Sequence, residues 1–161
     1  MNRITTIGVY GFTAETFLHQ LITEGVDLLL DLRQRRGVRG PDYSWANATR
    51  LQQSLTTANI TYRHIKPLAP TTDLRHLQYR EDARQGVGKR TRTALSPAYI
   101  TRYTQEILTP FNLPALLSTL PPTSTFALFC VERDPEACHR SLVAARLSTA
   151  TARPVTNLRP T

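Results

Sequence analysis

The chain has 161 residues, about the length of one domain, and its hydrophobic fraction of 40% beside a charged fraction of 20% excludes an intrinsically disordered protein. The longest apolar runs are only as long as a strand, and no charged segment with an apolar core follows Met1. We therefore expect no membrane span, no signal peptide and a cytoplasmic protein. The formal net charge of +8 indicates an anionic partner: a nucleic acid, a phosphorylated ligand or an acidic protein face.

Short apolar runs bounded by turn residues predict the strands. These cover residues 4–10, 26–32, 60–65 and 126–129, with an edge strand at 154–158. Apolar residues at helical spacing, together with capping residues, predict the helices. These cover residues 14–23, 45–57, 71–84, 97–108 and 113–120, and one more helix opens at Asp134-Pro135.

The alternation of strands and helices implies crossover connections and a largely parallel sheet. We therefore predict a single α/β domain over residues 1–161, a three-layer sandwich around a mostly parallel sheet of about five strands. A helical insertion separates strands three and four. Its basic segment 66–95 is expected to cover the carboxyl edge of the sheet or to reach a partner.

The stretch 125–146 carries most of the chemically active side chains. An apolar strand runs into a short polar turn and then into a helix, and α/β sheets bind ligands at such junctions because free backbone N–H groups and the helix dipole point there. The second strand places an aspartate and an arginine, Asp31 and Arg33, at the same edge of the sheet. The residues concerned are Asp31, Arg33, Cys130, Glu132, Cys138, His139 and Arg140.

Three short motifs lie at these positions. The first strand contains Thr6-Ile7-Gly8, the second closes on Asp31-Leu32-Arg33, and the fourth leads into Cys-x-Glu and then Cys-His-Arg. This arrangement resembles domain-of-unknown-function family 488 over nearly the whole chain. The resemblance implies a fold and a site but no reaction. The signature residues carried over by position are Gly8, Asp31, Arg33, Cys130, Glu132, Cys138, His139 and Arg140.

The two cysteines are too few for a disulfide framework, so each has other interpretations. Cys130, at a strand end facing a helix N-terminus, is either a nucleophile with a lowered pKa or a buried and inert thiol. Cys138 and His139 can join Cys130 as metal ligands. The seven residues between the cysteines form a weak metal-binding pattern, so we predict no metal and assign no cofactor.

The carboxylates also have two interpretations. Asp31 and Glu132 act either as general acid and base or as ionised partners of basic residues. The partners expected in the second case are Arg33 or Arg140 for Asp31, and Arg133 or His139 for Glu132. Arg33 and Arg140, placed together near a helix N-terminus, are predicted to bind an anion.

Two basic loops are the candidates for a nucleic-acid interface, because they offer cations for phosphate contacts and have aromatic residues nearby for stacking. The aromatic residues are Tyr43, Trp45 and Tyr62. The cations are Arg35, Arg36, Arg39, Lys89, Arg90 and Arg92.

Two functions remain open. The first is a small enzyme in which arginines hold a phosphorylated or nucleotide-like anion, a cysteine reacts, and a carboxylate or imidazole moves protons. The second is a non-enzymatic nucleic-acid-binding protein in which the signature residues form a structural network. The enzyme requires Cys130, Arg33 and Arg140 to converge on an open pocket. The binding protein requires them buried and mutually satisfied, with the basic loops on one continuous face.

Overall fold

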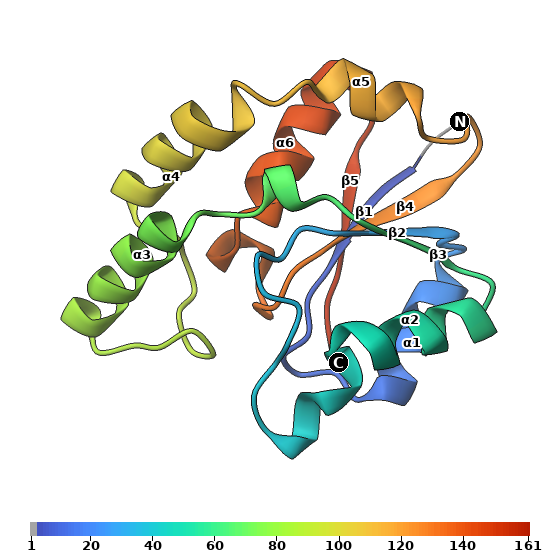
Figure 1. Cartoon of the computed structure of the whole chain (residues 1–161), viewed down its shortest axis with the longest axis horizontal. Coiled ribbons are helices and arrows are strands. Elements are labelled where there is room, and N and C mark those ends of the chain that lie inside the picture. Colours follow the sequence, from blue (N-terminus) through green and yellow to red (C-terminus); the bar gives the residue numbers. More distant parts are fainter. Residues whose placement is uncertain (1–2) are drawn as a thin grey trace.

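The computed structural model describes residues 3–161 and contains one sheet of five parallel strands in the order β3-β2-β4-β1-β5 (Figure 1). The strands are β1 (Arg3–Ile7), β2 (Leu28–Asp31), β3 (Thr61–His64), β4 (Thr125–Phe129) and β5 (Val155–Leu158). Every residue of β2 and β4 is buried, which explains why their sequences are continuous apolar runs rather than alternating patterns. The predicted α/β fold with about five parallel strands is confirmed.

Helices cover both faces of the sheet (Figure 1). One face packs against α1 (Ala14–Thr23) and α2 (Ala48–Thr57), whose buried Phe17 and Leu51 share a core with Phe129 of β4. The opposite core joins side chains of the other helices to Leu30 and Leu128 of the sheet. Those helices are α3 (Thr72–Gln85), α4 (Pro97–Tyr103), α5 (Leu113–Ser118) and α6 (Arg140–Thr151). The result is the expected three-layer sandwich.

The predicted insertion between strands three and four is helical, and it contains α3, α4 and α5. The helix predicted over 97–108 is α4 followed by a π-helical segment, Thr104–Leu108. Tyr103 anchors this region, because its buried hydroxyl donates to the carbonyl oxygen of Leu68 at 2.6 Å. Within residues 3–161 the helices are all too short or too polar to cross a membrane.

The last helix begins later than the sequence predicts. Pro135–Ala137 forms one 3₁₀ turn, Cys138 is extended (φ −139°, ψ 144°), and α6 starts only at Arg140. Asp134 caps nothing with its side chain and instead pairs with Arg159 at 3.4 Å, which explains why its N-cap pattern misleads. The extended backbone at Cys138 therefore lies between two helical turns instead of inside one helix.

Smaller differences concern two other boundaries. The first strand ends at Ile7, because the backbone N–H groups of Val9 and Tyr10 both donate to the carbonyl oxygen of Val131 and so close the ladder. The helix predicted from position 45 is the 3₁₀ segment Pro41–Ala46 followed by α2.

The strand order creates a crevice at the carboxyl edge of the sheet. Strands β2 and β4 are neighbours, yet the chain leaves β2 toward α2 on one face and leaves β4 toward α6 on the other. Loops that diverge in this way leave a space beyond the strand ends, where α/β proteins bind ligands.

Candidate functional site

A pocket of about 630 Å³ lies at this edge of the sheet. The segment 33–39 after β2 and the segment 130–132 after β4 line it, and α3 and the segment 88–92 of the insertion complete the wall. The basic insertion therefore contributes directly to the space at the carboxyl edge. Its volume is in the range of small-molecule binding sites.

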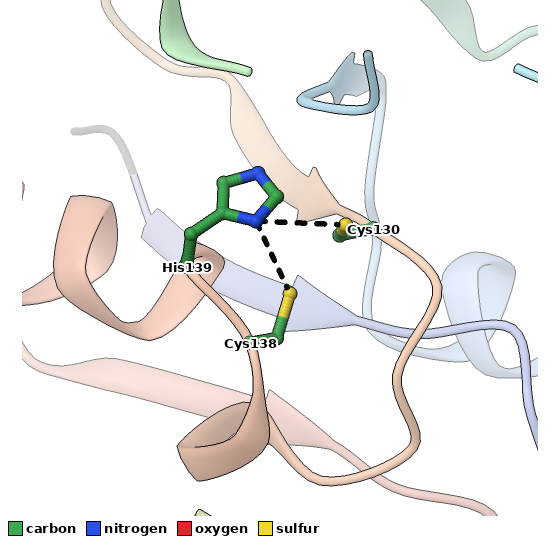
Figure 2. Close-up of side chains that lie close together, drawn as sticks. All are labelled: Cys130, Cys138 and His139. Atoms are coloured by element: carbon green, nitrogen blue, oxygen red, sulfur yellow. Dashed lines mark hydrogen bonds between the residues drawn. The ribbon is translucent and has the colours of Figure 1, made fainter. Parts of the chain in front are cut away.

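Cys130 and His139 line this pocket, and Cys138 lies beside them; Figure 2 shows the three side chains facing one another from the strand end and the start of α6. The sulfur atoms of Cys130 and Cys138 lie 3.8 and 3.7 Å from Nδ1 of His139. The other ring nitrogen, Nε2, lies 2.9 Å from the carbonyl oxygen of Leu32. Because a carbonyl only accepts hydrogen bonds, Nε2 is the donor, and Nδ1 of the neutral ring faces both sulfurs. We call Cys130, Cys138 and His139 the Cys–His cluster.

Burial and mutual contact give the cluster unequal proton affinities. Burial and the neighbouring Cys138 raise the pKa of Cys130 well above its usual value. Burial opposes ionisation of Cys138, but the hydrogen bond with Cys130 and the charge of His139 outweigh it and lower the Cys138 pKa well below its usual value. Burial lowers the pKa of His139 while Cys138 raises it, with a net rise. The raised pKa of Cys130 favours its interpretation as a buried thiol over its interpretation as a nucleophile with a lowered pKa.

Asp31 and Arg33 form a fully buried ion pair, as one of the two sequence interpretations predicts. The Arg33 guanidinium donates to both carboxylate oxygens, with Nη2 2.9 Å from Oδ2, and its Nη1 donates to the carbonyl oxygen of Ala46 at 2.9 Å. Tyr62 donates to Asp31 Oδ2 at 2.6 Å. Every nitrogen of the guanidinium is thus bonded within the protein.

Glu132 has a different partner from the two that the sequence suggests. It pairs neither with Arg133 nor with His139: its Oε1 accepts from Nη2 of Arg92 at 2.6 Å, and Arg92 Nη1 donates to Asp82 at 2.7 Å. All three side chains are buried. Burial raises the pKa of Glu132, as does Cys138, while Arg92 opposes the shift. This ion triad joins the insertion to the loop after β4.

Arg140 holds the same loop from the other side. Its Nη1 donates to the carbonyl oxygen of Glu132 at 2.6 Å and its Nη2 to that of Arg133 at 3.1 Å. The side chain is fully buried and does not line the pocket. The structure therefore does not bring Arg33 and Arg140 together at one anion site, because Arg140 does not line the pocket and its Nη1 and Nη2 donate to backbone carbonyls, while Asp31 and Ala46 accept from Arg33.

Five other cations line the pocket and provide its positive charge. None of them forms an ion pair with a carboxylate in the part of the chain that the structure describes. Arg90 lies over the rings of Tyr10 and Tyr43, at 5.0 and 5.2 Å from their centres. Glu132 is the single acid of the wall, and Arg92 already neutralises it. We call these five the rim cations: Arg35, Arg39, Arg75, Lys89 and Arg90.

The predicted nucleic-acid residues therefore separate into two groups. Arg35, Arg39, Lys89 and Arg90 line one pocket, whereas the buried Arg92 has its guanidinium in the ion triad. Arg36 is not in the pocket wall, and its Nη1 donates to the hydroxyl of Tyr62 at 3.3 Å. The role predicted for Arg92 is therefore corrected, and the role of Arg36 stays a prediction.

Of the aromatic residues named for stacking, Trp45 packs its ring against Phe17 in the core at 4.8 Å and is not in the pocket wall. The hydroxyl of Tyr62 donates a hydrogen bond to Asp31, so Trp45 and Tyr62 both belong to the structural scaffold. Tyr43 alone contacts a rim cation.

Sequence reasoning expected the segment 66–95 at this edge of the sheet but named no site residue on α3. Arg75, His76 and Tyr79 line the pocket, and Arg75 donates to Gln34 of the β2 loop at 2.9 Å. The charged residues of this helix were the one sequence feature that could have indicated the pocket. A charged helix usually indicates a solvated surface, however, and the pattern alone does not show which face of the helix borders a pocket.

The model of a protein family, the domain of unknown function DUF488, matches residues 13–147. The chain belongs to the DUF488 family. The matched region contains the Cys–His cluster, the ion triad and all the rim cations of this DUF488 protein. Every residue that lines the pocket except Tyr10 therefore lies within the region that the family model matches. No curated protein and no solved structure matches the chain.

Proposed function

We propose that this DUF488 protein is a small enzyme that binds a phosphorylated or nucleotide-like anion in the pocket and acts on it with the Cys–His cluster. The observation that supports this most is the composition of one pocket: five cations that have no acidic partner among residues 3–161 surround a buried thiol and imidazole. Such a pocket attracts a phosphate group and leaves the cluster as the reacting centre at its base.

The rim cations are suited to a phosphate because most of them are arginines. A guanidinium presents several N–H donors in a fixed plane, which matches the oxygens of a phosphate, and Lys89 adds a point charge. Arg75 is positioned by Gln34 and Tyr79, and Arg90 by the two tyrosine rings, so part of the rim is already ordered without a ligand. Ordered donors lower the entropic cost of binding.

Removing a rim cation is expected to weaken anion binding. We predict that Arg35→Ser and Lys89→Ser each reduce the affinity for ADP, measured by calorimetry at low salt, by about tenfold or more, the value of a charge-assisted hydrogen bond. Arg84→Ser is the matched control, because Arg84 is exposed, pairs with Glu81 and does not line this pocket. Equal affinities in all three variants would contradict the proposal.

The thiols offer a second test, because only Cys130 of the two lines the pocket. In reduced, chelator-treated protein we expect saturating ADP to slow the alkylation of Cys130 by iodoacetamide, because the bound anion covers this thiol. The modified site is read by peptide mass, and Cys130→Ser removes this event. A rate of Cys130 alkylation that ADP does not change would separate the anion site from the cluster.

A nucleic-acid-binding function is the alternative, and one observation favours it. Arg39 and Arg90 are exposed and joined by a hydrogen bond from Arg90 Nη2 to the Arg39 carbonyl oxygen at 3.2 Å, which brings the two basic loops together. A protein that binds the phosphate backbone of nucleic acids would bind single-stranded oligonucleotides with an affinity that rises with their length and falls steeply with salt concentration. Tight oligonucleotide binding with no detectable ADP binding would favour this function over the enzyme.

A further inference from the structure

We propose that Cys130, Cys138 and His139 bind a thiophilic divalent metal ion such as Zn²⁺, through the two sulfurs and Nδ1 of the imidazole. The three ligand atoms lie within 4.8 Å of one another, and all three residues are buried. The sequence favoured no metal because seven residues separate the cysteines, but the folded loop brings both sulfurs to one nitrogen (Figure 2).

The distances are close to those of a filled site. A tetrahedral zinc ion with bonds of about 2.3 Å to sulfur and about 2.0–2.1 Å to nitrogen holds a sulfur and a nitrogen ligand about 3.5 Å apart. The observed separations from Nδ1 are 3.8 Å for Cys130 and 3.7 Å for Cys138. Each sulfur would therefore approach Nδ1 by only a few tenths of an ångström. The two sulfurs, which lie within 4.8 Å of each other, would come to about 3.8 Å apart in a tetrahedral site.

The histidine already has the orientation that a metal ligand needs. Its Nε2–H donates to the carbonyl oxygen of Leu32 at 2.9 Å, so the lone pair of the neutral ring is on Nδ1, on the side of the two sulfurs. Metal-bound histidines usually donate their second N–H to a carbonyl or carboxylate in this way, which fixes both the tautomer and the ring. The ring also packs against Tyr103, at 5.4 Å between centres.

The backbone around the cysteines is held in place without a metal. Cys130 ends the ladder of β4, with its N–H bonded to the carbonyl oxygen of Ile7. Arg140 clamps the first part of the loop through the carbonyls of Glu132 and Arg133. A site built on a strand end and a clamped loop is largely preorganised for its ion.

Charge balance also favours a divalent ion. Binding would release to solvent the protons that the two sulfurs and Nδ1 carry without metal and would place two thiolates on one M²⁺, so the buried group of metal and sulfurs becomes neutral overall. A neutral group is easier to bury than an isolated charge. Sulfur and imidazole ligands select zinc and similar ions over Mg²⁺ or Ca²⁺, which prefer oxygen.

Three protein ligands leave a fourth coordination position, which is typical of catalytic rather than structural zinc sites. Cys130 and His139 line the pocket, so an ion that they hold would be accessible to a molecule in the pocket. Glu132 lies on the same wall, and its Oε2 is buried without a hydrogen-bond partner in the part of the chain that the structure describes. It is placed to accept a proton or hydrogen bond from a water molecule near the ion. With metal bound, the open position and not the Cys130 sulfur is the reacting centre.

Cobalt provides a direct test, because Co²⁺ replaces zinc in such sites and reports thiolate bonding through its sulfur-to-metal charge-transfer absorption. We expect reduced, chelator-treated protein to bind one Co²⁺ per chain with this absorption, and Zn²⁺ to displace it. Cys130→Ser, Cys138→Ser and His139→Gln should each weaken binding by about 100-fold or more, at or beyond the loss typical of second-shell changes. His76→Gln, an exposed histidine of the same pocket, is the matched control.

The unaltered chain gives a readout that does not depend on whether the variants fold. An aromatic disulfide reagent should titrate two thiols in the metal-free protein and be strongly slowed when equimolar Zn²⁺ is added. Thiols that react equally fast with and without Zn²⁺, or a cobalt spectrum that lacks the sulfur band, would overturn the proposal. Metal binding needs no anion, so a failure of ADP to bind would count against the proposed function and not against the metal site.

Discussion

Replacing Arg92 by methionine is expected to destabilise the protein by about 3–5 kcal/mol, the cost of leaving buried charges without their partner. Arg92 donates to Asp82 at 2.7 Å, to Glu132 at 2.6 Å and to the carbonyl oxygen of Ala137 at 3.0 Å. Methionine fills much of the same space but supplies none of these donors. The variant leaves two buried carboxylates unpaired, and the link between the insertion and the β4 loop is lost.

The free energy of unfolding, measured by urea denaturation, checks this expectation. Arg102→Met is the matched control, because Arg102 pairs with Glu106 on the exposed surface of the insertion, where such a pair contributes about 0–1 kcal/mol. Adding Asp82→Asn and Glu132→Gln to Arg92→Met should recover part of the loss, since the amides carry no charge. A loss no larger than that of Arg102→Met would show that the triad does not hold the insertion.

The ion triad of Arg92, Asp82 and Glu132 could not be predicted from the sequence. Arg92 stands in a run of cations and glycines without acids, which usually indicates a solvated loop, and its partners lie 10 and 40 residues away along the chain. Asp82 belongs to α3, whose polar sequence predicts an exposed helix. In the structure Gln78 and Asp82 are buried and joined by a hydrogen bond of 2.9 Å. Ion pairs between distant segments leave no periodic pattern in a sequence.

The parts that were predictable depend on local rules. The apolar runs that became β2 and β4 needed no alternation because both faces of the sheet are covered, and Asp31 and Arg33 are two residues apart at one strand end. The convergence of Cys130 and Cys138 was only partly predictable. Their junction was visible, but the distance between their sulfurs depends on the 3₁₀ turn at 135–137 and the extended Cys138, which the sequence presented as one helix.

Gly8→Ala is expected to destabilise the protein by about 3 kcal/mol, the upper part of the usual range for overpacking. Gly8 follows β1, and a Cβ there would lie 2.0 Å from the carbonyl oxygen of Glu132 and 3.2 Å from Nη1 of Arg140. These are the two atoms of the 2.6 Å hydrogen bond that clamps the loop after β4. The added methyl group cannot be accommodated by a side-chain rotation alone, because the nearest atom belongs to the backbone.

Gly88→Ala is the matched control, since no atom lies within 4 Å of its added Cβ and its φ is not in the left-handed region. We expect its free energy of unfolding to stay within about 0.5 kcal/mol of the original. The loop that Gly8 contacts also carries Cys130 and Glu132, so Gly8→Ala should weaken Co²⁺ binding as well, because the ligands lose their fixed spacing. If Gly8→Ala matches Gly88→Ala in stability and keeps its cobalt spectrum, then the β4 loop moves freely. The cluster geometry would in that case depend on α6 and Leu32 rather than on the contact between the first and fourth strands.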